Sequence, residues 1–334
     1  MGKNVERTFF KENFRRAHHT EPGVITDINN VGDFYREGFL RALDRELLKK
    51  AAFTVVVDFS FSPSSQMLPQ LLNELGFSVI ALNAYVNEGR GGQTREKEQA
   101  LGQLSAIVAS LGAQAGFWLD SSAEAITMVD ETGRICTGID LLSLTVALLM
   151  KSGQKGMIAV PVQAPSTTEQ MAAQKGCQVV RTKSSDRAMQ EVASSSEIVL
   201  TGTTDGRFAF PRFQSAFDGM FAIARLMELS AGSGVTLSQA LADVPRSAFL
   251  QTSLPCPWEM KGGIMRKMSE DSLEKEATFI DGIKVHFGAE WVLVLPDQYL
   301  PVVHIVAEAR DQKSAQKLLG EYEKKIVAWK KELV

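Results

Sequence analysis

Short runs of consecutive apolar residues recur along most of the chain, and helical patterns separate them. The clearest run is 53–58, Phe-Thr-Val-Val-Val-Asp, which has the composition of a buried strand. Similar runs predict further strands at 77–82, 115–119, 125–129, 157–161, 177–181 and 197–201. Apolar positions three or four residues apart predict helices at 33–50, 95–111, 139–150, 166–175, 185–195 and 216–231. Strands that alternate with helices favour crossover connections and a mostly parallel sheet.

From about residue 255 onward the order of the elements changes. The pattern predicts a helix at 258–270, short strands at 277–280, 283–287, 291–295 and 302–308, and a closing amphipathic helix at 311–333. Strands grouped before a helix are typical of an α+β domain. The expected fold class is therefore α/β, with two three-layer α/β/α domains followed by a small α+β domain. We place a leader and helix at 1–50, the α/β/α domains at 51–152 and 153–254, and the α+β domain at 255–334.

Composition narrows the class of protein. Of 334 residues, 45% are apolar and 22% charged, as in soluble globular proteins, which excludes disorder and collagen. The net charge is −3 and no long Lys/Arg block occurs, so no nucleic-acid partner is expected. The longest charge-free stretch, 99–119, contains several Gln, Ser and Gly residues, so no membrane span is expected either.

The cysteines and the first twenty residues indicate the cellular compartment of the protein. Cys136, Cys177 and Cys256 are widely spaced, form no CxxC pair and suggest neither a metal clip nor a disulfide framework. The first twenty residues carry several charges and no apolar run typical of a secretory signal. We therefore expect a cytoplasmic protein.

Five short motifs, in their order and spacing, resemble landmarks of a known family. They are 53–58 with 68–76, 129–135, Arg181-Thr-Lys183, Phe217-Asp-Gly219 and Asp281-Gly-Ile-Lys-Val285. Together they resemble the alpha-D-phosphohexomutases, the family of phosphoglucomutases and phosphomannomutases, from about residue 33 onward. Members have four domains, and a phosphorylated serine in the first transfers the phosphoryl group. The resemblance implies that 51–152, 153–254 and 255–334 correspond to the second, third and fourth domains, and 1–50 to a remnant of the first.

A narrower resemblance lies at 256–262, Cys-Pro-Trp-Glu-Met-Lys-Gly, followed by Met265-Arg266. It is similar to the carboxy-terminal mutase-like part of bacterial fusion proteins whose front half is a mannose-1-phosphate guanylyltransferase. This implies a sugar nucleotidyltransferase domain or subunit as a partner. No serine loop of the Ser-His-Asn-Pro kind occurs in the sequence, so no catalytic residue is assigned.

The stretch 120–125, Asp-Ser-Ser-Ala-Glu-Ala, resembles the family's metal loop, which reads Asp-Gly-Asp-x-Asp-Arg. Asp120 is retained, and Glu124 replaces one carboxylate. These two side chains with the Ser122 hydroxyl would hold Mg²⁺ only weakly, since Mg²⁺ prefers several oxygen ligands. The alternative is that Asp120 caps a turn and Glu124 is solvated. No cofactor is therefore assigned, and Mg²⁺ stays a candidate.

The stretch 202–207, Gly-Thr-Thr-Asp-Gly-Arg, resembles the family's sugar-binding loop. Thr203 and Asp205 can hydrogen-bond sugar hydroxyls, although a plain glycine turn explains the same residues. Arg207 could form an anion-binding patch with Arg181 and Lys183. The alternative for these cations is a solvated strand end.

The stretch 295–301, Leu-Pro-Asp-Gln-Tyr-Leu-Pro, stands where the family has its phosphate loop, Arg-Pro-Ser-Gly-Thr-Glu-Pro. Leu295 replaces the arginine, and Asp297 adds a negative charge that would repel phosphate. Phosphate binding at this loop is therefore not expected.

Three hypotheses about function follow from retained core patterns and altered loops. The first is a degenerate, non-catalytic phosphohexomutase-like module in nucleotide-sugar synthesis of the GDP-mannose type or polysaccharide synthesis. It would assemble with or regulate the nucleotidyltransferase and bind a sugar phosphate or nucleotide sugar. The second is a sugar-phosphate mutase that needs a first domain from another chain. The third is a structural module that forms homo-oligomers through the closing helix.

Overall fold

The structure is a computed structural model that describes residues 2–18, 23–86 and 94–333. It divides into two units, one up to Glu37 and one from Gly38 onward. The first unit contains α1 (Gly2–Phe10) and the start of α2 (Val31–Arg41). The single helix expected at 33–50 is wrong, because α3 (Arg45–Ala51) begins anew. The Asp44 carboxylate accepts the N–H of Leu47 at 3.0 Å, so it caps α3 and ends the continuous helical pattern.

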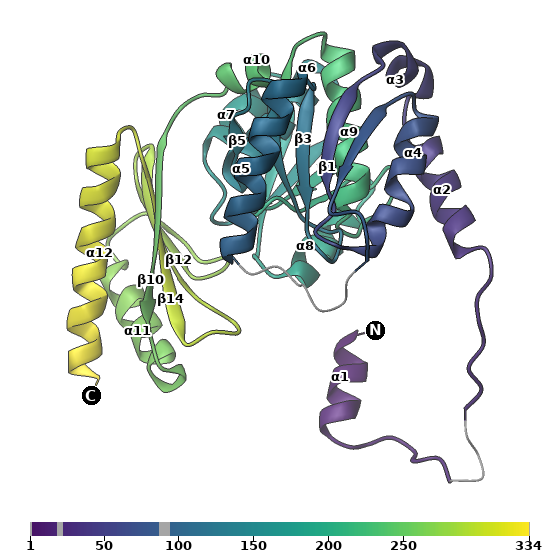
Figure 1. Ribbon diagram of the computed structural model, residues 1–334. Helices are drawn as coiled ribbons and strands as arrows, with labels where there is room; N and C mark the ends of the chain where they lie inside the picture. The colour runs from purple at the N-terminus through teal and green to yellow at the C-terminus, as the bar shows by residue number, and fades with distance from the viewer. Residues whose placement is uncertain (1, 19–22, 87–93, 334) are drawn as a thin grey trace. The chain divides into compact units, whose positions relative to one another are not determined.

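The first sheet has the strand order β2-β1-β3-β4-β5. Figure 1 labels its strands β1, β3 and β5. Its strands are β1 (Thr54–Asp58), β2 (Ser78–Leu82), β3 (Ala115–Leu119), β4 (Ile126–Asp130) and β5 (Ile135–Cys136). Strand β1 pairs in parallel with β2 and β3, whereas β4 and β5 are antiparallel. The short helix η1 (Pro63–Gln66) and α4 (Leu68–Glu74) connect β1 to β2, and α5 (Thr94–Leu111) precedes β3. Leu104 and Val108 of α5 pack on Val56 and Val129 of the sheet.

The second sheet has the order β7-β6-β8-β9, and β6 pairs in parallel with β7 and β8. Its strands are β6 (Met157–Pro161), β7 (Gln178–Thr182), β8 (Ile198–Gly202) and β9 (Phe208–Ala209). The helices of this part are α6 (Gly138–Lys151), α7 (Thr167–Ala173), α8 (Asp186–Ala193), α9 (Gly219–Ser233) and α10 (Leu237–Ala242). Both sheets thus have the parallel core that the sequence predicts, with antiparallel strands added at one edge.

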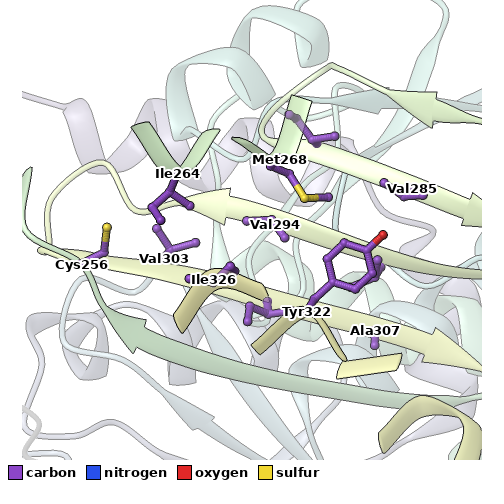
Figure 2. Packing of buried hydrophobic residues seen from close by; sticks show 12 residues of the cluster. Cys256, Ile264, Met268, Val285, Val294, Val303, Ala307, Tyr322 and Ile326 are labelled. Atoms are coloured by element: carbon purple, nitrogen blue, oxygen red, sulfur yellow. The ribbon is translucent and has the colours of Figure 1, made fainter. Parts of the chain in front are cut away.

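The third sheet is antiparallel throughout, in the order β10-β14-β13-β12-β11. Its strands are β10 (Ala248–Pro255), β11 (Ala277–Thr278), β12 (Ile283–Phe287), β13 (Glu290–Pro296) and β14 (Val302–Ala309). Helices α11 (Trp258–Asp271) and α12 (Gln312–Glu332) cover one face, where Tyr322, Ile326 and Met268 pack against Val294 and Val303 (Figure 2). The sequence missed β10, because its mixed polar and apolar residues resemble a connecting segment. The expected α/β fold class is confirmed.

None of the helices in the described ranges is long and apolar enough to cross a membrane.

The other face of the third sheet packs partly on the second α/β part. Trp291, Leu293 and Val306 form a buried cluster with Val162, which follows β6. Beside the cluster lies Glu308, which is 3% exposed. These contacts fix the third sheet against the loops that follow β6 and β7.

Lys284 is a buried cation at this junction. Its ammonium lies 3.5 Å from the ring centre of Trp291 and donates to a backbone carbonyl at 3.2 Å. Burial lowers the pKa of Lys284 to about 7, and the positive charge of Arg181 adds to the shift. Glu169 and Glu308 oppose it without cancelling it. The junction therefore favours the neutral form of Lys284 above about pH 7.

Replacing Lys284 by Met is expected to remove a pH dependence of stability. The pKa of Lys284 is lower in the folded chain than the ordinary value of 10.5. The unfolded chain therefore binds more protons between about pH 7 and 10.5, and the wild-type protein gains stability as the pH rises through that window. The unfolding free energy of the wild type relative to Lys284→Met should rise from pH 7 to pH 10 in urea titrations. If the difference in unfolding free energy between the two proteins does not change from pH 7 to pH 10, burial does not lower the pKa of Lys284.

Candidate functional site

A cavity of about 350 Å³ lies between the second α/β part and the third sheet. Its lining comes from the loop 184–186 after β7, from Thr204 and Arg207 between β8 and β9, and from the loop 295–299 between β13 and β14. Gln251 of β10 and Asp281 before β12 complete the opposite side. The Asp281 carboxylate accepts the N–H of Ser184 at 2.9 Å, which ties the two sides together.

The loop 202–207 is closed by its own side chains. The N–H of Arg207 donates to Oγ1 of Thr203 at 3.0 Å, and the Thr203 hydroxyl donates to the Asp205 carboxylate. Thr203 is 4% exposed, so its side chain stabilises the turn. Gly206 has φ +93°, and a Cβ there would lie 2.2 Å from the carbonyl oxygen of Ile126. The turn therefore requires glycine and lies directly against the first residue of β4.

Arg207 is the one predicted ligand-binding residue whose side chain lines the cavity. Its guanidinium pairs with Asp186 at 2.6 Å and with Asp205 at 2.9 Å, and it lies 5.0 Å from the ring centre of Phe217. The side chain is 20% exposed. Two carboxylates already balance its charge, so a ligand would meet Arg207 as part of a neutralised cluster.

Arg181 lies at the end of β7 and is held by the chain itself. Its guanidinium bonds both carboxylate oxygens of Glu169, at 2.6 and 2.7 Å. It also donates to backbone carbonyls of the segment 161–165. Lys183 is exposed and forms no ion pair with any residue that the structure describes. Neither cation is among the residues that line the cavity. The patch of Arg181, Lys183 and Arg207 stays a prediction.

The loop 120–125 folds around the Asp120 carboxylate. Oδ1 accepts the N–H groups of Glu124 and Ala125, at 2.8 and 3.0 Å, and Oδ2 accepts the Ser122 hydroxyl at 2.6 Å. Glu124 is exposed, and the described part of the chain contains no cluster of three His, Cys, Asp or Glu side chains that could hold a metal. The geometry corresponds to the capping alternative for Asp120. The residues present here do not fit Mg²⁺, which prefers a fuller set of oxygen ligands.

Lys97 in the first turns of α5 also belongs to this region, and the sequence reasoning missed it. Its ammonium lies 4.3 Å from the ring centre of Trp118. Burial lowers the pKa of Lys97, while the negative charges of Asp120 and Asp205 oppose the shift. A helix that follows a parallel strand begins at the carboxyl edge of the sheet, where such loops gather. That rule would have placed Lys97 at this edge.

The loop 295–301 has a carboxylate of its own where an anion could bind. Oδ1 of Asp297 accepts the N–H groups of Tyr299 and Leu300, each at 2.7 Å. Oδ2 lies 2.8 Å from Nε2 of His304. Burial alone would raise the pKa of Asp297, but the bonds from His304, Tyr299 and Leu300 outweigh it and hold the pKa at about 2. Asp297 is therefore ionised and occupies the donors of the loop.

Among the charged side chains that line the cavity, acidic ones outnumber basic ones. Asp186, Asp281 and Asp297 contribute carboxylates, while Arg207 contributes a guanidinium. Carboxylate and amide groups at such a wall accept and donate hydrogen bonds to hydroxyl groups. A doubly charged phosphate would meet net repulsion at the same wall.

Comparison with known proteins agrees with this architecture. Residues 33–133 match the family model of phosphoglucomutase/phosphomannomutase alpha/beta/alpha domain II, and residues 138–247 match that of domain III. The first match begins inside the segment expected at 1–50, and the second begins at the first residue of α6, a helix that was expected within 51–152. The boundaries at 50, 152 and 254 stay predictions.

Curated relatives match nearly the whole chain. A "Probable phosphoglucosamine mutase" of Pyrococcus horikoshii is 30% identical over 327 residues, covering 96% of this chain and 70% of the relative. A "Phosphoglucomutase/phosphomannomutase" of Thermococcus kodakarensis is 29% identical over 318 residues, covering 94% of this chain and 69% of the relative. Among solved structures, a phosphoglucomutase/phosphomannomutase family protein from Burkholderia thailandensis superposes with a TM-score of 0.82 at 18% identity, covering 98% of this chain and 70% of that one.

Proposed function

Because the chain belongs to the phosphoglucomutase/phosphomannomutase family, we propose that it is a sugar-recognising module of that fold that does not itself transfer a phosphoryl group. The observation that carries this proposal is the Asp297 carboxylate, which occupies the N–H groups of Tyr299 and Leu300. Phosphoryl transfer depends on positioning the phosphate and neutralising its charge. This loop supplies a negative charge instead.

The loop 120–125 supports the same proposal. Both oxygens of the Asp120 carboxylate take part in the turn, and Glu124 is exposed. The cavity between the loops 202–207 and 295–301 nevertheless has carboxylate and amide groups suited to hydroxyls. The combination favours binding of the sugar rather than of its phosphate.

We propose a sugar nucleotidyltransferase domain or subunit as the partner, in GDP-mannose-type nucleotide-sugar or polysaccharide synthesis. The resemblance of 256–262 to the guanylyltransferase fusions motivates this. Trp258 in that segment is 52% exposed at the start of α11, with the Lys261 ammonium 3.6 Å from its ring centre. Exposed tryptophans are frequent anchors of protein interfaces. Co-elution with a mannose-1-phosphate guanylyltransferase, lost in Trp258→Ala, tests the partner; no co-elution would count against it.

A second candidate is a sugar-phosphate mutase that takes its first domain from another chain. The names of the relatives, phosphoglucosamine mutase and phosphoglucomutase/phosphomannomutase, favour it. It predicts turnover once a first domain with a phosphoserine loop is added. A role of α12 in homo-oligomers also stays a prediction, and its buried residues Ala315, Tyr322 and Ile326 pack within the chain.

The direct test of the main proposal is an assay of glucose 1-phosphate conversion by the chain mixed with a mutase first domain that carries a phosphoserine loop, in the presence of Mg²⁺ and glucose 1,6-bisphosphate. We expect no conversion above the rate without protein. A related mutase with an intact phosphate loop serves as the positive control. Conversion by this mixture would contradict the main proposal and support the second candidate.

A further inference from the structure

Three side chains on the face of the third sheet that is turned toward the second α/β part form a chain of hydrogen bonds. Oγ of Ser253 lies 2.8 Å from Nδ1 of His304, and Nε2 of the same ring lies 2.8 Å from Oδ2 of Asp297. We propose that Ser253 is a nucleophile activated by His304, and that this cluster hydrolyses a carboxylic ester held in the adjacent cavity. The inference does not depend on the proposed function.

The register of the sheet creates the contact. The N–H of Cys256 donates to the carbonyl of Pro301 at 2.6 Å, and bonded and non-bonded pairs alternate along antiparallel strands. Ser253 and His304 lie directly opposite each other, three positions away from the hydrogen-bonded pair of Cys256 and Pro301. They therefore form a non-bonded pair. Side chains of such pairs approach most closely, which allows a hydroxyl to reach the imidazole.

The neighbouring groups determine the tautomer of His304. Asp297 is ionised, because its pKa is held at about 2, and a carboxylate only accepts hydrogen bonds. The proton of the neutral ring is therefore on Nε2, and Nδ1 presents a lone pair to the Ser253 hydroxyl. A serine, a base and a carboxylate that orients the base are the parts that nucleophilic catalysis requires. Here the two ring nitrogens have exchanged the places they occupy in the serine proteases.

The cluster is accessible from the cavity. Asp297 and His304 both line it, and their side chains are 20% and 22% exposed. Ser253 is exposed on β10, which is the edge strand of the sheet. The residues on either side of Ser253 form the hydrogen-bonded pairs with β14. The N–H of Ser253 therefore points away from β14, to the outer edge of the sheet. That N–H can donate to the oxyanion that develops beside Oγ.

The proposed reaction is balanced with water as the second substrate. His304 Nδ1 takes the Ser253 proton as Oγ bonds to the acyl carbon, and the bond from that carbon to the alcohol oxygen breaks. The imidazolium returns its proton to the leaving alcohol. Water then attacks the acyl-serine with His304 again as base, which releases the carboxylic acid and restores the hydroxyl.

The surroundings favour an uncharged ester over a phosphate ester. Asp281 lines the cavity with the ionised Asp297, so an anionic substrate would be repelled. The amide side chains of Gln251 and Gln298 line it as well, and amides both donate to and accept from hydroxyl and carbonyl groups. A small acyl group on a hydroxylated molecule fits this chemistry.

The same sheet contains a matched control. Oγ1 of Thr278 lies 2.9 Å from Nε2 of His286, which makes a hydroxyl–imidazole pair close in length to the 2.8 Å pair of Ser253 and His304. Within the described residues no carboxylate hydrogen-bonds His286. The pair of Thr278 and His286 therefore measures the reactivity of a hydroxyl–imidazole contact that has no carboxylate on the second ring nitrogen.

The experiment treats the full chain with a fluorophosphonate probe, locates the label by peptide mass spectrometry and measures p-nitrophenyl acetate hydrolysis. We expect label at Ser253, none in Ser253→Ala, and rates at least about 100-fold lower in Asp297→Asn, whose amide would place the ring proton on Nδ1. Thr278→Ala and His286→Gln should react like the wild type. Circular dichroism confirms that each variant is folded.

Label at Ser253 that is unchanged in folded Asp297→Asn would overturn the proposal, because the hydrogen bonds would then have a structural role alone. Label no faster than in the heat-unfolded chain, or on other serines, would overturn it too.

Discussion

Replacing Glu308 by Ala should lower the free energy of unfolding by about 3–5 kcal/mol. Glu308 is 3% exposed, and its carboxylate accepts the N–H of Ser166 at 2.8 Å, the indole N–H of Trp291 at 2.6 Å and the Ser247 hydroxyl at 2.6 Å. Alanine leaves these donors without their charged acceptor and removes a negative charge near the buried Lys284. Urea unfolding followed by tryptophan fluorescence measures the loss.

Glu308→Gln is the matched control, because it keeps the shape of the side chain and one acceptor oxygen. We expect it to cost about 1–2 kcal/mol, between the wild type and the alanine variant. A loss below about 1 kcal/mol for Glu308→Ala would mean that water replaces the carboxylate and that the junction beside the cavity is held by its apolar cluster.

Replacing Asp297 by Ala should turn the loop 295–301 into an anion site. The N–H groups of Tyr299 and Leu300, each 2.7 Å from the carboxylate in the wild type, would become available. Adjacent backbone N–H groups in a turn bind anions well. A dissociation constant of about 1 mM would stabilise the variant by about 2.7 kcal/mol in roughly 100 mM phosphate. Thermal unfolding with and without phosphate measures the effect.

Two controls isolate the role of the Asp297 charge. Potassium chloride at equal ionic strength separates binding from screening. Asp297→Asn retains an oxygen that can accept the same N–H groups, so phosphate should stabilise it as little as the wild type. Equal stabilisation of the wild type and Asp297→Ala by phosphate would show that the carboxylate does not block the loop.

Strong periodic runs gave the most accurate predictions of the fold. Strand β6 is predicted at its observed residues, 157–161, because a short apolar run follows the charged and glycine-containing segment 151–156. Strand β10 was missed, since its side chains alternate between exposed and half-buried positions at a sheet edge. The break between α2 and α3 depends on a single cap at Asp44, which a pattern of apolar positions does not register.

The candidate site was predictable only where its chemistry lies within one loop. The loop 202–207 contained Arg207, which does line the cavity. Ser253 and His304 are 51 residues apart and meet only through the register of β10 and β14, so no local motif points to them. Arg181 was identified as a cation at a strand end, but its pairing with Glu169 depends on how α7 packs against β7.

We propose that the cavity between the loops 202–207 and 295–301 binds a sugar without binding its phosphate. The most direct measurement compares mannose with mannose 1-phosphate, and glucose with glucose 1-phosphate, by calorimetric titration of the chain with and without Mg²⁺. We expect that a free sugar binds and that its phosphate does not tighten the binding, with no effect of Mg²⁺. Phosphate that tightens binding tenfold or more, about 1.4 kcal/mol, or no binding of any sugar would contradict the account.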